Sequence, residues 1–155
     1  MSLPVRQFNT YMFLKLPSAW WCGVRLESLT ETEAQVRVRH RWVNQNPFRS
    51  MFWAVQGMAA EFASGALATD HIRRSGQKVS MLVIGNKAHF SKKATGLIRF
   101  RCEDGAALKA ALERALQTGE GQTVWMKSVG TDEQGDTVST FLFEWALKVK
   151  AGSKK

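Results

Sequence analysis

One long apolar segment constrains the fold of this chain more than any other feature of its sequence. From Met51 to Ala68 nearly every residue is apolar or small, and the segment is long enough for about five helical turns. It is rich in Ala, Gly and Ser and carries Glu61, which is unlike a membrane anchor and typical of a helix buried in a globular protein. We expect this helix to run to about Asp70, with Ser50 as its N-cap.

The segments on either side of this helix have the patterns of strands, and several of them alternate apolar and polar residues as half-buried strands do. They are residues 24–29, 34–39, 78–90, 95–103 and the two arms of a hairpin over 122–150, whose turn is 131–136. In the last arm, alternate residues from 141 to 149 are apolar and share one face. Shorter helices are expected over 5–16 and 106–116, the second with Gly119 as C-cap. Consecutive hairpins predict an antiparallel sheet, so the expected fold class is α+β.

The strand expected over 78–90 is apolar on both faces in its first half. Strands that are covered on both faces lie in the middle of a sheet. We therefore expect a central strand here, with the long helix packed over it.

Composition indicates one globular domain, over residues 1–150, followed by a flexible basic tail at 151–155. Six Trp and nine Phe residues are interpreted as core and pocket lining. The net charge of +9 permits anionic partners, but no expected helix has a dense basic face, so solubility is favoured over nucleic-acid binding. No signal-peptide layout or membrane span is expected, and Cys22 and Cys102 lack a C-x-x-C spacing, so we expect a cytoplasmic location.

The neighbours of Glu61 at helical spacing are two glycines, Gly57 and Gly65. Each glycine costs about 1 kcal/mol of helix propensity relative to alanine, so a stripe of two suggests that another group approaches the helix closely there. A carboxylate in such a place must be paired, hydrogen-bonded or protonated. It is either a structural group bonded to a loop or to a cation such as Lys87, or a catalytic group.

Asn46 precedes Glu61 in a spacing that resembles the active-site pattern of hotdog-fold acyl-CoA thioesterases of the phenylacetyl-CoA thioesterase type. That pattern is Asn-x-x-Gly-x-x-His-Gly-Gly and, after six further residues, an acidic residue. The element order also matches a hotdog, in which an antiparallel sheet wraps one long helix, and "HFSKKATG" resembles the family's link between the strands that follow the helix. With its "LPSAWWCG" opening, the chain is most similar to a poorly characterised branch of these proteins.

The resemblance implies hydrolysis of an acyl-CoA or related thioester, with Glu61 as general base on a water or, less favoured, as nucleophile. Asn46 would position the water or the carbonyl, with Asn44 as a second candidate for this role. The backbone amides at the N-terminal end of the helix would bind the oxyanion. The pocket residues expected there are Phe52, Trp53, Ala54 and Gly57. The sequence departs from the family at Arg49, which stands for Gly, and at Phe52, Trp53 and Ala54, which stand for His-Gly-Gly and narrow the approach.

Basic side chains near one hairpin are candidates for binding the phosphates of coenzyme A. They are Lys87, Lys92 and Lys93, with Arg73 and Arg74 beyond the helix as further candidates. The alternative is a solvated sheet edge whose charges prevent aggregation. No cofactor or metal is expected, since His40, His71 and His89 lack ligand-like spacing.

The small-molecule partner implied is an acyl thioester, and the expected assembly is a homodimer or a dimer of dimers. The principal alternative is a non-catalytic hotdog protein that binds acyl-CoA or an acyl chain. A weaker alternative, from net charge alone, is a nucleic-acid-binding module.

Overall fold

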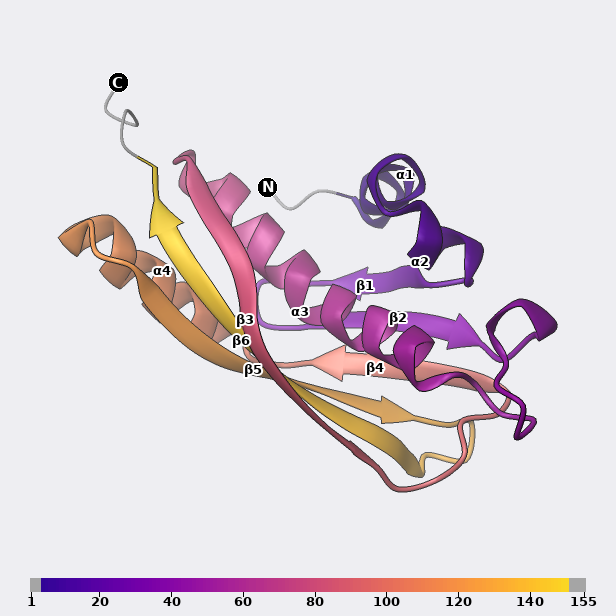
Figure 1. Ribbon diagram of the computed structural model, residues 1–155. Coiled ribbons are helices and arrows are strands. Elements are labelled where there is room, and N and C mark those ends of the chain that lie inside the picture. Colours follow the sequence, from indigo (N-terminus) through magenta and orange to yellow (C-terminus); the bar gives the residue numbers. More distant parts are fainter. Residues whose placement is uncertain (1–3, 151–155) are drawn as a thin grey trace.

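The computed structural model describes residues 4–150, so the expected tail at 151–155 lies outside the described residues (Figure 1). In this range the helices are α1 (Val5–Lys15), α2 (Pro17–Trp21), α3 (Trp53–Ser75) and α4 (Gly105–Thr118), with a short 3-10 turn η1 (Trp42–Asn44). The strands are β1 (Arg25–Leu29), β2 (Ala34–Arg39), β3 (Val79–Phe90), β4 (Leu97–Cys102), β5 (Gln122–Thr131) and β6 (Thr137–Val149).

These strands form one antiparallel sheet in the order β1-β2-β4-β5-β6-β3. The sheet curves around α3, which packs on strands β1, β2, β4, β5 and β6 (Figure 1). The predicted α+β architecture, an antiparallel sheet wrapped around one long helix, is confirmed. The hairpin turn is also as expected, with Gly135 at φ 86°, and so is the C-cap of α4, where Gly119 has φ 73°.

The boundaries of α3 differ from the sequence prediction at both ends. The helix begins at Trp53 with Phe52 at the N-cap position, and no side chain caps it. Ser50 as N-cap was therefore wrong, because its hydroxyl lies 3.1 Å from the amide nitrogen of Asn46 and accepts a hydrogen bond from it. At the other end α3 continues beyond Asp70 to Ser75 and stops at Gly76, which adopts φ 66°.

The glycine stripe of α3 lies against the aromatic face of β6. A Cβ atom on Gly57 would lie 3.5 Å from the ring of Phe141, and one on Gly65 would lie 3.5 Å from the ring of Trp145. The predicted common face of alternate residues in β6 is confirmed by their burial from Phe141 to Leu147. The group that approaches the helix closely is thus a row of aromatic rings, which pack at van der Waals distance only because the two positions lack side chains.

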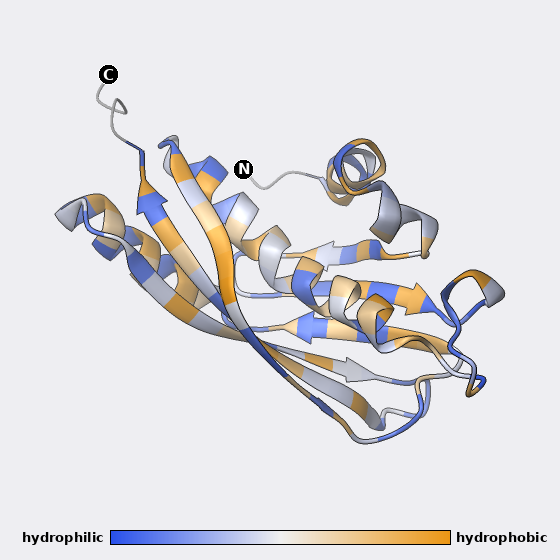
Figure 2. Ribbon diagram, viewed as in Figure 1, coloured by the Kyte–Doolittle hydropathy of each residue, from blue (hydrophilic) through white to orange (hydrophobic). Residues whose placement is uncertain are grey.

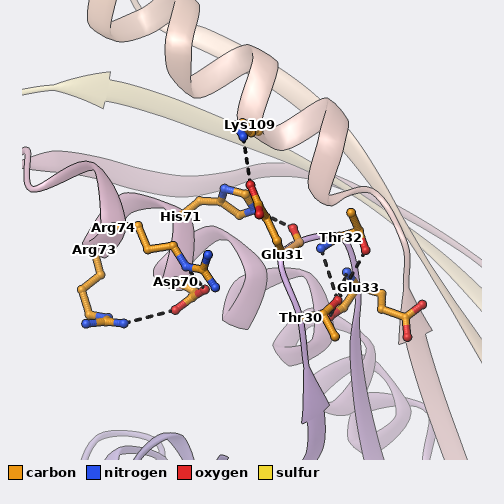
Figure 3. Close-up of polar contacts among 9 residues, drawn as sticks. All are labelled: Thr30, Glu31, Thr32, Glu33, Asp70, His71, Arg73, Arg74 and Lys109. Carbon is orange, nitrogen blue, oxygen red and sulfur yellow. Dashed lines mark hydrogen bonds and ion pairs between the residues drawn. The ribbon is translucent and has the colours of Figure 1, made fainter. Parts of the chain in front are cut away.

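The C-terminal half of α3 is tied to the β1–β2 turn and to α4 (Figure 3). The ring Nε2 of His71 lies 2.8 Å from the carbonyl oxygen of Glu31, and Lys109 of α4 donates to the carboxylate of the same residue at 2.9 Å. Asp70 and Arg74 form an ion pair of 2.7 Å. Asp70 and His71 are both buried, and α3 extends past them to Ser75.

β3 is an edge strand, so its prediction as a central strand was wrong. It pairs only with β6, and none of its residues is fully buried. Leu82 and Ile84 are 64% and 51% exposed on the outer face of the sheet. Figure 2 shows the apolar first half of this strand at the margin of the sheet. The segment is apolar on both faces although nothing in residues 4–150 covers its outer side.

Close packing between strands gives a first test of the fold. A Cβ on Gly130 of β5 would lie 2.5 Å from the ring of Phe100, which is fully buried. We expect Gly130→Ala to lower the free energy of unfolding by about 1–3 kcal/mol, measured by chemical denaturation, because the ring has no free space to move into. Gly121→Ala is the matched control, since its Cβ would meet only the Leu147 carbonyl at 3.7 Å. Equal stabilities for the two variants would contradict this packing.

Candidate functional site

Glu61 lies in a cavity of about 250 Å³ between α1, α3 and the sheet. The cavity is lined from α1 by Phe8, Tyr11 and Lys15, from α3 by Glu61, Phe62, Gly65 and Thr69, and from the sheet by Met81 and Trp145, with Leu16 at its rim. Its walls are mostly apolar or aromatic, and the carboxylate is the acidic group among them. Such a cavity, mostly apolar with a few polar groups in its wall, is the usual form of a small-molecule site.

The carboxylate of Glu61 has no hydrogen-bond or ion-pair partner among residues 4–150. Burial raises the pKa of this carboxyl above its usual value, because the cavity disfavours the charged form. The absent side chain of Gly65 leaves space beside it, since a Cβ there would lie 3.6 Å from Oε1 of Glu61. Lys87, the possible structural partner, instead lies on β3 with its ammonium 5.1 Å from the ring centre of Trp125.

The roof of the cavity is α1, which sequence reasoning did not assign to the site. Asn9 fixes this helix against β1, because its side-chain amide donates to the Leu26 carbonyl at 3.0 Å and accepts from the Leu26 N–H at 2.9 Å. Phe8 and Met12 are buried beneath the helix. The periodicity of the segment predicted its helix, but the positions of Tyr11 and Lys15 over Glu61 depend on this long-range docking.

A second, larger cavity of about 590 Å³ lies at the N-terminal end of α3. It is lined by residues 46–48, 50–53, Gln56 and 90–94, including the rings of Phe48, Phe52, Trp53 and Phe90. Because α3 has no side-chain cap, the N–H groups of its first turn, at Trp53 and Ala54, are not occupied by a capping group. Of the predicted oxyanion and pocket residues, Phe52 and Trp53 line this cavity, whereas the side chain of Ala54 does not line it and Gly57 faces Phe141.

Asn46 and Asn44 are both held by hydrogen bonds to the backbone. The oxygen of the Asn46 side chain accepts from the N–H groups of Phe48 at 2.9 Å and Ser50 at 3.2 Å, which closes the loop before α3. Asn44 is buried, and its amide donates to the carbonyls of Cys22 at 2.9 Å and Arg39 at 2.8 Å. Asn44 thus has a structural role, and Asn46 shapes the rim of the second cavity.

The basic candidates for phosphate binding lie at separate places. Lys92 and Lys93 line the second cavity, where Lys92 forms ion pairs with Asp132 at 2.6 Å and Asp136 at 2.7 Å. Lys87 contacts Trp125. Arg73 and Arg74 are at the opposite end of α3, beside Asp70 (Figure 3).

Glu61 and the amides at the start of α3 belong to different cavities of the chain. Glu61 follows Trp53 by eight residues, which is about 12 Å along a helix axis. One thioester carbonyl cannot reach both groups within a single copy of the chain.

Comparison with known proteins places the chain in a family. Residues 5–147 match the family model described as Domain of unknown function (DUF4442). No curated protein sequence matches the chain.

Several solved structures share the fold. A protein of unknown function from Pseudomonas aeruginosa, described as a probable thioesterase, superposes with a TM-score of 0.80 at 22% identity, covering 97% of this chain and 99% of that one. A protein of unknown function from Chlorobaculum tepidum gives 0.81 at 13% identity, with 94% of each chain covered. A thioesterase from Haemophilus influenzae gives 0.72 at 10% identity, covering 100% and 97%.

At these identities the likeness shows the fold, which is the hotdog fold predicted from the sequence. No helix within residues 4–150 is long and apolar enough to cross a membrane. Together, the match over most of the sequence and the architecture identify this chain as a hotdog-fold member of the DUF4442 family.

Proposed function

We propose that this protein hydrolyses an acyl-CoA or related thioester, with Glu61 as the general base. The observation that carries the proposal is a half-buried carboxylate with a raised pKa and no partner among the described residues, in a mostly apolar cavity. Such a group costs folding stability, and a strongly perturbed carboxyl in a cleft is a candidate catalytic group. The thioesterase neighbours of the same fold support the reaction class.

In this mechanism the carboxylate of Glu61 takes a proton from a water molecule. The water oxygen then bonds to the thioester carbonyl carbon, and the carbonyl electron pair moves onto oxygen. When the carbonyl re-forms, the carbon–sulfur bond breaks, and the thiolate leaves and takes up the proton from Glu61. A raised pKa suits this role, because a base near the working pH transfers protons most effectively.

The oxyanion donors are the first-turn amides of α3, which must come from a second copy of the chain. The edge strand β3 carries exposed apolar residues and unpaired backbone groups, and two copies can pair these strands antiparallel about a two-fold axis. Met81, near the start of β3, borders the Glu61 cavity, whereas Phe90, at its end, borders the α3 N-terminus. Antiparallel pairing therefore brings the partner's α3 N-terminus beside Glu61.

The remaining candidates have supporting roles in this proposal. Asn46 acts as a positioning residue, because its hydrogen bonds order the loop that leads into α3. Lys93 is the better placed of the candidates for coenzyme A phosphates, since Lys92 is held between two carboxylates. Its ammonium donates to the Phe48 carbonyl at 3.3 Å, at the rim of the second cavity.

A non-catalytic acyl-CoA-binding protein is the second candidate. It is favoured by Phe52 and Trp53, whose large side chains replace the small residues of the thioesterase pattern and border a cavity large enough for an acyl chain.

Glu61→Gln is the direct test of the base. We expect kcat on an acyl-CoA panel, followed with a thiol-reactive dye, to fall by about a hundred-fold or more. Glu113→Gln, an exposed position on α4, should retain wild-type rates. Activity that survives Glu61→Gln would exclude the assigned role. Thermal stabilisation by coenzyme A derivatives without turnover by the wild type would instead support the binding protein.

The pH dependence of stability tests the burial of Glu61 separately from catalysis. Its pKa is raised in the folded state, so the folded chain holds this proton more tightly than the unfolded chain does. The stability that depends on the protonated form is complete below the unfolded pKa and is lost as pH rises through the folded pKa. Glu61→Gln should match the wild-type Tm at acid pH and exceed it at neutral pH. A Tm difference that does not change with pH would contradict the burial.

The two-fold assembly can be tested at Ile84 on β3. We expect the wild type to be a dimer or larger by light scattering after size exclusion, and Ile84→Lys to shift it toward the monomer, since like charges would meet near the axis. Activity should fall with the dimer. Thr123→Lys, at an exposed position of β5, serves as the control for added charge. A wild type that is active as a monomer would refute the shared site.

A further inference from the structure

Four arginines gather at one end of strands β1 and β2. Arg25, Arg37, Arg39 and Arg41 line a cavity of about 250 Å³ together with Gly23, Val38 and Leu97. Arg25 and Arg37 are directly opposite each other in the β1–β2 register, an arrangement that destabilises a sheet when the charges are alike. Burial, together with the charges of Arg41 and Arg37, lowers the pKa of Arg25.

Most of this positive charge is not neutralised by the protein. Arg39 forms an exposed ion pair of 3.3 Å with Glu133, but within residues 4–150 no carboxylate lies within ion-pair distance of Arg25, Arg37 or Arg41. The nearby Glu27 is held by Arg99 at 2.8 Å. The first acidic residue of the whole sequence is this Glu27, so the helices beside the cluster add no negative charge.

One of the guanidinium groups, that of Arg25, is held in place by the fold, and that of Arg41 lies close to Gly23. The Arg25 guanidinium lies 3.3 Å from the ring centre of Trp20 and donates to the Trp20 carbonyl at 2.9 Å. Arg41 packs on Gly23, where a Cβ would lie 2.5 Å from its Nη2. An arginine fixed as Arg25 is binds phosphate oxygens with little further loss of side-chain entropy.

Two highly exposed tryptophans flank the cluster. Trp21 at the end of α2 is 72% exposed and Trp42 in η1 is 85% exposed, contrary to the sequence interpretation of the tryptophans as core and pocket lining. The Asn44 amide joins their segments through the carbonyls of Cys22 and Arg39. Figure 1 shows α2 and the η1 segment at the same end of the molecule.

We propose that this end of the molecule docks on an anionic phospholipid bilayer, with Arg25, Arg37 and Arg41 on lipid phosphates and Trp21 and Trp42 at the headgroup level. Arginine and tryptophan together match the charge and the polarity gradient of that interface. A soluble phosphate in the cavity would not cover the tryptophans, because neither lines it. Strand pairing at β3 would not cover them either, since β1 and β3 are opposite edges of the sheet. The inference does not depend on hydrolysis.

The test is sedimentation of the whole protein with vesicles of phosphatidylcholine, alone or mixed equally with phosphatidylglycerol. We expect binding to the mixed vesicles only. Arg37→Gln should lower the partition coefficient about five-fold, the usual effect of one arginine at an anionic surface. Arg114→Gln on α4 removes the same charge elsewhere and should have less effect. If the partition coefficient fell equally in the two variants, binding would depend on net charge alone, and the proposal would be overturned.

Tryptophan insertion is tested with brominated phospholipids, which quench the fluorescence of tryptophans that enter the bilayer. The amount of fluorescence that the brominated lipids quench should fall in Trp42→Ala and in Trp21→Ala. Trp125 is an exposed tryptophan of β5, and Trp125→Ala should leave the quenched amount unchanged. Thermal unfolding of each variant checks that it is folded. Binding of pyrophosphate at the arginines without any vesicle binding would overturn the docking in favour of a soluble phosphate ligand.

Discussion

The packing of α3 against the aromatic face of β6 is the contact on which the candidate site depends. Gly57 and Gly65 lower the intrinsic stability of the helix by about 1 kcal/mol each, but they allow Phe141 and Trp145 to lie at van der Waals distance. The indole N–H of Trp145 donates to Ser64 at 3.0 Å, and the Ser64 hydroxyl donates to the Glu61 carbonyl at 2.9 Å. The turn of helix that carries the carboxylate is therefore fixed to the sheet.

The environment of Glu61 follows from this contact together with the docking of α1. The sheet and α3 alone would leave the carboxylate at an open surface, where its charge would be hydrated. Asn9 holds α1 over it through two hydrogen bonds to Leu26, and Phe8 and Met12 fill the space between. The same packing that stabilises the fold thus desolvates one carboxyl and raises its pKa. The desolvation of Glu61 therefore lowers the free energy of unfolding and at the same time changes the acid–base properties of its carboxyl.

The sequence patterns predicted those features that depend on neighbours along the chain. The apolar run predicted α3, alternation predicted the shared face of β6, and the glycine stripe predicted a close approach. Patterns could not reveal that β3 lies at an edge, because a strand that is apolar on both faces has the same sequence whether its own chain or another copy covers it. Sequence patterns could not predict that Tyr11 covers the Glu61 cavity or where Asn46 lies, for a similar reason. Their surroundings are set by contacts such as Asn9 with Leu26 and by hydrogen bonds within one loop.

Phe52 and Trp53 are the strongest departure from the thioesterase pattern. Their positions limit how far they obstruct access to the backbone amides at the start of α3. Every residue except proline retains a backbone N–H, so replacing glycine changes access to the amides and not their number. The two rings pack edge to face with centres 6.0 Å apart and are 45% and 58% exposed. They line the second cavity without filling it, since about 590 Å³ remains beside them. The bulky pair therefore forms an aromatic wall along the approach to the α3 amides, a wall that suits an apolar acyl group better than a polar one.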